Sequence, residues 1–406
     1  MFDELAKYEI KIRDVSIRAI DLFFFCVILG LAIAVRLPFL DLVSGDYYYF
    51  LSHWMDECHR AGGLQYLGIV PGKSENSTIN YGCMYQYIIV LLHYLGRFAS
   101  DIYLIKWVSV IFDIVCSITA MRIAFIVSDN DVSRALMAFG IASFLPTAVL
   151  NSAAWAQCDS VYVAFIMLSF LSYLRGREAR TYIYFALAYS FKQQAVFILP
   201  FYVIMWMKGR LSLKKIYLVP VTIFCTMIPA MIAGRRPAEL LSIYLKQANT
   251  YTMLSMNYPS IYTFISSSLK VETRKMIISA GLIAAIAVMG FLAYYIWNRH
   301  FEITREYMLT LVILSSLLCL FVLPVMHERY GYLPEMLAAV YGVTRYNRLI
   351  ICAVLQCMSI VTYSRFLFGS PVRDIWPLTI IMFVVIACVG HDLMAQMDKK
   401  ELTDAG

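Results

Sequence analysis

Long apolar runs, separated by short polar segments, recur along the whole chain. The clearest cover residues 19–40, 277–297 and 307–325. Each approaches the roughly 20 residues that cross the hydrocarbon core of a bilayer as a helix. The runs are continuously apolar and do not alternate, which is typical of helices and argues against the strands of a membrane barrel. The pattern therefore predicts an all-α polytopic membrane protein with roughly ten to twelve transmembrane helices.

Composition supports the same class. Of the 406 residues, 61% are hydrophobic and 15% are charged, and the mean hydropathy is +0.69. So few ionisable groups do not coat the surface of soluble domains, which excludes a soluble multidomain enzyme. The net charge of +7 comes from Lys and Arg clusters between apolar runs, which report membrane orientation and not a nucleic-acid partner. The ten cysteines show no metal-binding spacing, so no cofactor is expected, and a divalent metal stays an open alternative.

The basic clusters predict the orientation of the chain. Basic residues precede the first apolar run, so the positive-inside rule places the N-terminus in the cytoplasm and the segment after residue 40 outside. The clusters RGREAR (175–180) and KGRLSLKK (208–215) are both expected to be cytoplasmic. A single span over 182–206 would separate them, and FKQQ (191–194) interrupts that stretch. We therefore expect two short helices of half the membrane depth that meet at FKQQ, and a cytoplasmic C-terminus.

Two modules are expected along the chain. Residues 1–233 form a membrane module whose first outer loop, 41–84, carries candidate chemistry. Residues 234–406 form a second membrane module with an outer loop at 234–258 and the motif MHERY at 326–330. The apolar stretch 85–96 is too short to span, so we expect a helix in the outer interface there.

This topology brings several polar motifs together outside the membrane. They are SGDYYYFLSHWMDEC (44–58), NSAAWAQCDS (151–160), the 234–258 loop and MHERY. Asp46 and Asp159 are the candidate catalytic acids, although a lone acid after a helix is more often a solvated turn residue and an acid at a helix start is often ordinary. Lys192 of FKQQ lies in an apolar stretch, where a charge is costly and therefore a functional candidate. The alternative is a lysine that snorkels or pairs with a carboxylate.

Taken in order, these motifs resemble those of integral-membrane GT-C glycosyltransferases, particularly bacterial proteins related to the second GPI mannosyltransferase. The resemblance covers most of the chain and is clearest between Ser44 and Tyr330. Such proteins usually read WGQ where this chain has Ala156 between Trp155 and Gln157. It implies a GT-C-like bundle that moves a hexose, such as mannose or glucose, from a polyprenyl-phosphate donor to an extracytoplasmic glycan or lipid-linked acceptor. The family's catalytic acid in the first outer loop corresponds to Asp46.

The chemistry of such a donor agrees with one catalytic carboxylate. A phosphate monoester has a second pKa of about 6 and leaves without protonation. The carboxylate then acts as general base on the acceptor hydroxyl, which inverts the configuration of the sugar by analogy with inverting glycosidases. Cations in a dry site stabilise the departing phosphate. The candidate phosphate-binding residues are Arg329, His327, Lys192, Arg235 and Arg236.

Each candidate has a plainer interpretation. Arg235 and Arg236 are equally typical of an interfacial pair that contacts lipid phosphates. For His327 and Arg329 the plainer role is a cap or an ion pair with Glu328, and the cluster of three charged types beside a proline favours phosphate binding over it. Candidate substrate-binding residues share a place in the outer motifs or in FKQQ; they are Tyr48, Trp54, Trp155, Gln157, Gln193, Tyr251 and Glu328. Aromatic side chains at a membrane boundary are more often anchors than sugar platforms.

Two further functions remain as alternatives. A transporter or flippase of a lipid-linked saccharide would use the same cations and aromatic rings without chemistry, but would carry ionisable residues along a path through both leaflets. A polysaccharide polymerase or ligase would use a polyprenyl diphosphate donor. The expected location is a bacterial plasma membrane, with the endoplasmic reticulum as the alternative and membrane lipids as neighbours.

Overall fold

The computed structural model shows a helical bundle with two very short sheets in its described part. It describes residues 9–12, 15–69, 81–248, 252–266, 268–370 and 374–401. The first part contains β1 (Glu9–Ile12), β2 (Val15–Arg18), α2 (Ala19–Ala34), α3 (Ser52–Ala61), α4 (Cys83–Leu95), α5 (Asp101–Val127), α6 (Val132–Ser143), α7 (Pro146–Val149), α8 (Asp159–Leu174) and α9 (Glu178–Phe191). The second contains α10 (Leu199–Met207), α11 (Leu218–Ile232), α12 (Pro237–Ala248), β3 (Ser255–Met256), α13 (Val271–Trp297), α14 (Arg305–Val322), β4 (Met326–His327), α15 (Tyr332–Thr344), α16 (Leu349–Leu367) and α17 (Trp376–Glu401).

The helices make this an all-α polytopic membrane protein. Seven helical segments of the described residues are long and apolar enough to cross a membrane, or up to eight if the bent pair α6–α7 is one span. Shorter apolar helices lie at 83–95, 159–174 and 193–207. The predicted ten to twelve spans are reached only if these shorter helices are counted, because their length falls below the roughly 20 residues of a full crossing.

The predicted break at FKQQ is confirmed. α9 ends at Phe191, Lys192 is extended (φ −154°, ψ 130°), and a 3-10 helix over 193–198 leads into α10. The chain turns back at this break. Tyr182, near the start of α9, donates a hydrogen bond from its hydroxyl to the carbonyl of Ser212, which follows α10 (2.6 Å). The basic clusters before α9 and after α10 therefore lie at the same end of the bundle.

Two other segments differ from the expectation. The continuous apolar run over 135–150 is not one straight helix: it is bent by 48° between α6 and α7, where Pro146 starts the second helix. Proline lacks a backbone N–H and is best tolerated in the first turn of a helix, which favours the end of one helix and the start of another here. The predicted outer loop at 234–258 contains a regular helix, α12, whose positions 240, 243 and 244 are buried.

The core is shared by both predicted modules. One hydrophobic cluster takes side chains from α5, α8, α14 and α15, so the boundary at residue 233 does not separate two cores. α8 and α15 are buried almost throughout. By contrast, α2, α11 and α13 expose large apolar side chains, as expected of helices that face lipid.

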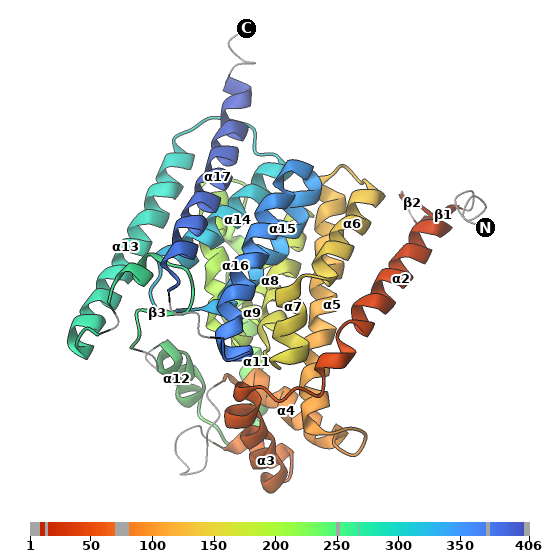
Figure 1. Cartoon of the computed structure of the whole chain (residues 1–406), viewed down its shortest axis with the longest axis vertical. Helices are drawn as coiled ribbons and strands as arrows, with labels where there is room; N and C mark the ends of the chain where they lie inside the picture. Colours follow the sequence, from red (N-terminus) through yellow and green to blue (C-terminus); the bar gives the residue numbers. More distant parts are fainter. Residues whose placement is uncertain are drawn as a thin grey trace.

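The bundle has two distinct ends (Figure 1). β1, β2 and the last turns of α17 lie at the upper end of the view, and α3, α4 and α12 lie at the lower end. A buried ion pair ties the first helix to the centre, because Arg36 Nη2 lies 3.1 Å from Asp113 Oδ2 of α5. Asp113 also accepts hydrogen bonds from Ser152 and Tyr332. The start of the first outer loop is thereby held against α5 and α15.

The orientation is testable with single cysteines in a background from which the native cysteines are removed. Arg60→Cys on exposed α3 should react with a membrane-impermeant thiol reagent in intact cells. Arg180→Cys and Lys214→Cys, one in each basic cluster, should react only after permeabilisation, because positively charged segments stay in the cytoplasm. Labelling of only one of these two in intact cells would contradict the hairpin at FKQQ.

Candidate active site

A buried guanidinium joins carboxylates from three separate parts of the chain. Arg329 Nε lies 3.4 Å from Asp159 Oδ2, and Arg329 Nη1 lies 3.4 Å from Glu328 Oε1 and 3.8 Å from Asp46 Oδ2. The Arg329 side chain is 13% exposed. The two candidate acids, Asp46 and Asp159, therefore share one cation, although 113 positions separate them in the sequence. We call Asp46, Asp159, Lys192, Glu328 and Arg329 the charged cluster.

Lys192 completes this cluster from the break between α9 and α10. Its Nζ forms a short ion pair with Asp159 Oδ1. Asn151 Nδ2 donates a hydrogen bond to the other oxygen of Asp159 (3.1 Å). Tyr330 and Tyr162 face the ammonium group with ring centroids at 5.3 and 5.4 Å. Since Asp159 is fully buried, two cations and an amide satisfy it, and it is a structural anion that holds Lys192 and Arg329 near one another.

Asp46 differs from the other acids of the cluster by its exposure. Its side chain is 32% exposed, whereas Asp159 and Glu328 are 0% and 1% exposed. Gln157 Nε2 donates a hydrogen bond to Asp46 Oδ2. Ser44 anchors the same turn, because its hydroxyl donates to the Trp155 carbonyl (2.7 Å). The first outer loop thus packs against the turn at Trp155–Gln157, which we call the WAQ turn, and the carboxylate of Asp46 remains accessible to a ligand.

The WAQ turn has an unusual backbone. A π-helical turn over 150–154 is followed by Ala156, whose φ is +63°. This left-handed region costs an L-residue roughly 1–2 kcal/mol and is normally occupied by glycine. The left-handed φ is therefore a physical reason for glycine at this position, where this chain has alanine. The turn directs Gln157 toward Asp46, while the Gln157 carbonyl accepts a hydrogen bond from Ser109 (2.6 Å).

A second strained residue precedes MHERY. Val325 has φ +63°, which is rare for a β-branched side chain. Its N–H donates to the Leu254 carbonyl (2.8 Å), and β4 then pairs in parallel with β3, with Met256 opposite His327. Strained backbone of this kind persists where the surroundings over-determine it, and it clusters at functional sites. Both turns that present the charged cluster are strained in this way.

Burial changes the charges around Arg329, in the segment between α14 and α15. It raises the pKa of Glu328 to about 7, against the opposing pull of Arg329. It lowers the pKa of His327 to about 2, with Arg329 and Lys192 adding to the effect. A pKa this low favours the neutral ring at physiological pH, so His327 would contact a phosphate as a hydrogen-bond donor and not as a cation. Arg329 keeps its charge: burial opposes ionisation, but Asp159 and Glu328 raise its pKa well above the usual value.

The other predicted cations lie apart from these contacts. Arg235 is 3% exposed and its Nη1 donates a hydrogen bond to Gln86 of α4. Arg236 is exposed at the start of α12. The structure therefore gives neither arginine a contact with the charged cluster in the described residues, and Arg235 fastens the entry of α12 to α4.

The predicted aromatic residues separate into different environments. Trp54 is 1% exposed and packs edge-on against Tyr81 and Tyr85, so it is a core residue and neither a sugar platform nor a membrane anchor. Trp155 is also buried, and Arg329 lies over its ring at 5.7 Å. Tyr48 is 61% exposed beside Asp46. Gln193 is half-buried next to Lys192, and Tyr251 lies outside the described residues.

Sequence reasoning missed several polar side chains that the fold buries. Asn151 and Tyr330 contact the cluster, and both stood inside motifs that were recognised for other residues. Glu335 of α15 is buried and accepts hydrogen bonds from Thr147 and Gln356. A polar residue within an apolar run is the signal that would have pointed to Glu335, as it did for Lys192.

The described residues contain no group of three or more His, Cys, Asp or Glu side chains arranged to hold a metal. The chain matches no model of a known protein family and no curated protein. The resemblance to GT-C enzymes therefore rests on the motifs.

The strain at Ala156 is measurable against a matched control. Ala156→Gly and Ala153→Gly each remove a fully buried methyl group from the same turn, but Ala153 is not among the residues with positive φ. We expect Ala156→Gly to be more stable than Ala153→Gly by about 1–2 kcal/mol, because only the first relieves a left-handed alanine. Unfolding of both variants in the same detergent checks this, and equal losses would show that Ala156 is not strained.

Glu328 should make stability depend on pH. Its pKa is about 7 in the folded protein against 4.5 for a free side chain, so folding favours the protonated form. Its contribution is complete below pH 4.5 and is lost as the pH rises through about 7, and it amounts to roughly 3 kcal/mol at most. Glu328→Gln should remove this part of the loss between pH 5 and 8, measured by thermal unfolding. Glu272→Gln on exposed α13 should retain the wild-type profile.

Proposed function

We propose that the protein is a membrane glycosyltransferase of the GT-C type, which transfers a hexose from a polyprenyl phosphate to an acceptor hydroxyl. One observation carries the proposal: a partly exposed carboxylate, Asp46, lies 3.8 Å from the cation Arg329, which shares the buried Asp159 with a second cation, Lys192. A base that an acceptor can reach and cations that can stabilise a phosphate are the two requirements of this reaction.

Asp46 is the best candidate for the base. Asp159 is buried and already occupied by Lys192, Arg329 and Asn151, so it offers no free oxygen to an acceptor. Glu328 is buried and its raised pKa leaves it substantially protonated near neutral pH, which makes it a weak base there. Gln157, through a hydrogen bond, and Arg329, whose Nη1 lies 3.8 Å away, orient the carboxylate of Asp46 while leaving part of it accessible.

Arg329 and Lys192 are the proposed phosphate ligands. A guanidinium can meet two phosphate oxygens with parallel hydrogen bonds, and an ammonium group adds a compact charge. Two cations this close would repel one another, and Asp159 between them offsets that repulsion. In the reaction, the acceptor oxygen attacks the anomeric carbon, its proton passes to Asp46, and the bond to phosphate breaks on the opposite face with inversion.

A transporter of a lipid-linked saccharide is the alternative function. It predicts ionisable side chains along a path through the bundle. Asp113 and Glu335 are buried there, but Arg36, Ser152 and Tyr332 bind the first, and Thr147, Gln356 and Ser359 bind the second. Fixed partners of this kind favour a role in holding helices together. We therefore prefer the enzyme.

We also propose that the charged cluster faces the outside of a bacterial plasma membrane and that both termini are cytoplasmic. The start of the first helix lies at the end opposite to α3 and α12 in Figure 1, and the Tyr182–Ser212 hydrogen bond keeps the two positive clusters together, which supports this orientation.

The proposal predicts a specific loss of activity. Purified protein, incubated with a panel of polyprenyl-phosphate hexoses and a membrane glycolipid or glycan extract as acceptor, with and without a chelator, should transfer the hexose to the acceptor and release polyprenyl phosphate. Asp46→Asn should slow turnover by roughly 10²- to 10⁴-fold with little change in donor affinity, because the amide keeps the shape but accepts no proton. Asp56→Asn, on the exposed side of α3, is the matched control and should keep its rate. Wild-type turnover by Asp46→Asn would refute this assignment of the base.

A further inference from the structure

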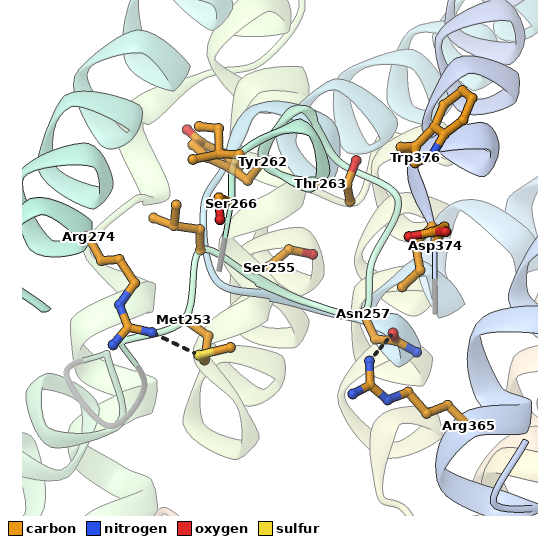
Figure 2. A pocket seen from close by; sticks show the side chains of 13 residues that line it. Met253, Ser255, Asn257, Tyr262, Thr263, Ser266, Arg274, Arg365, Asp374 and Trp376 are labelled. Atoms are coloured by element: carbon orange, nitrogen blue, oxygen red, sulfur yellow. Dashed lines mark hydrogen bonds between the residues drawn. The ribbon is translucent and has the colours of Figure 1, made fainter. Parts of the chain in front are cut away.

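A polar cavity lies apart from the residues of the charged cluster (Figure 2). It has a volume of about 400 Å³, within the range of small-molecule sites. It is lined by Met253, Leu254, Ser255, Asn257, Tyr262, Thr263, Ile265, Ser266, Arg274, Arg365, Asp374, Ile375 and Trp376. These residues come from the segment around β3, the first turns of α13, the end of α16 and the start of α17. None of them belongs to the charged cluster.

Two guanidinium groups on its walls lack a carboxylate partner. Arg274 approaches from α13 and Arg365 from α16, on opposite sides of the strand segment around Ser255 in Figure 2. Arg274 Nη1 donates to the sulfur of Met253 (3.2 Å), and Arg365 Nη1 donates to Asn257 Oδ1 (3.3 Å). Neither arginine forms an ion pair with a described residue, and the buried Nε of Arg274 has no hydrogen-bond partner. Asp374 also lines the cavity, so its two arginines leave one unit of positive charge in excess, which favours an anionic ligand.

The surroundings indicate that this ligand is amphiphilic. Trp376, 47% exposed at the start of α17, has the character of a residue at the membrane interface. Beyond the cavity, α13 and α17 expose apolar side chains such as Ile283 (70%) and Phe383 (60%) along spans that are mostly unburied. A polar cavity that continues into two lipid-facing helices suits a phosphate headgroup with an apolar tail.

We propose that this cavity binds the phosphate headgroup of a membrane lipid through Arg274 and Arg365. Ser255, Thr263 and Ser266 also line the walls, but their hydroxyl groups already bond Tyr258, Ser260 and Ser268, so the two arginines are the main donors. If the proposed function holds, this lipid carries the acceptor, because the cavity is separate from the Arg329 site assigned to the donor. The two sites are linked through β3, whose Ser255 lines the cavity and whose Met256 pairs with His327, two residues before Arg329.

The site is testable by binding alone. Delipidated full-length protein in detergent is titrated with an isoprenoid diphosphate or with phosphatidylglycerol, and bound lipids are counted by native mass spectrometry. The double variant Arg274→Ala, Arg365→Ala should lose one bound lipid and at least about tenfold in affinity, since two charge-assisted contacts are removed. Lys275→Ala, an adjacent exposed cation of α13 that does not line the cavity, should bind as wild type. Should the double variant fail to fold, each single Arg→Gln change replaces it.

The outcomes separate the two proposals. Unchanged lipid count and affinity in the arginine variants would overturn the cavity as a phosphate site. Tighter binding of phosphatidylglycerol than of the isoprenoid diphosphate would overturn the acceptor role, because any anionic phospholipid would then compete for the site. Asp46→Asn should bind both lipids normally, whether or not it is active, so failure of the proposed catalytic function leaves this measurement intact.

Discussion

The burial of Arg329 among acids from distant segments is the constraint on which the rest of this end of the molecule depends. Removing a charge from water costs several kcal/mol, and the cost is recovered only when opposite charges and hydrogen-bond partners arrive together. Asp159 at the start of α8, Glu328 beside Arg329, and Asp46 from the first outer loop each supply part of that compensation. Lys192 needs Asp159 in the same way, which requires α9 to end where it does. The loop, the FKQQ break and MHERY are therefore coupled in folding, and removal of one partner should disturb the others.

Strained backbone and a rigid support position this cluster. Ala156 and Val325 both adopt left-handed conformations at the turns that carry Gln157 and Arg329. Such conformations are retained because neighbouring contacts hold them, and here the Ser44–Trp155 hydrogen bond and the pairing of β3 with β4 do so. Deeper in the bundle, Asp113 of α5 binds Arg36, just after α2, and Tyr332 of α15. Movement of the first outer loop against the bundle is thereby restricted, which a reaction that depends on the placement of Asp46 requires.

The same end of the molecule divides its positive charge between two places. Arg329 and Lys192 are neutralised by carboxylates and lie deep, whereas Arg274 and Arg365 face a cavity whose one lining carboxylate, Asp374, forms no described ion pair with either of them. A phosphate that binds Arg329 and Lys192 must compete with the carboxylates of Asp46 and Asp159. Its binding there therefore depends on how those two carboxylates are placed. A phosphate in the cavity meets one wall carboxylate, Asp374, which no described ion pair joins to Arg274 or Arg365. This difference suits one site where charge develops during a reaction and another that retains a lipid.

Much of the fold could be predicted because hydropathy reports a local preference for lipid. The helical membrane class and the hairpin at FKQQ followed from runs of apolar residues and from the positions of Lys and Arg, each readable within about 20 residues. The candidate site was predictable only as a set of motifs. Exposure and charge state depend on partners far away in the sequence: Asp46 is open while Asp159 is occupied, His327 is neutral through burial, Trp54 is a core residue, and Arg235 is bound to Gln86. The cavity between α13, α16 and α17 left no local pattern for the same reason. The sequence by itself determined which segments enter the membrane, whereas only the tertiary structure decided which polar groups remain available, because desolvation and pairing are properties of the packed chain.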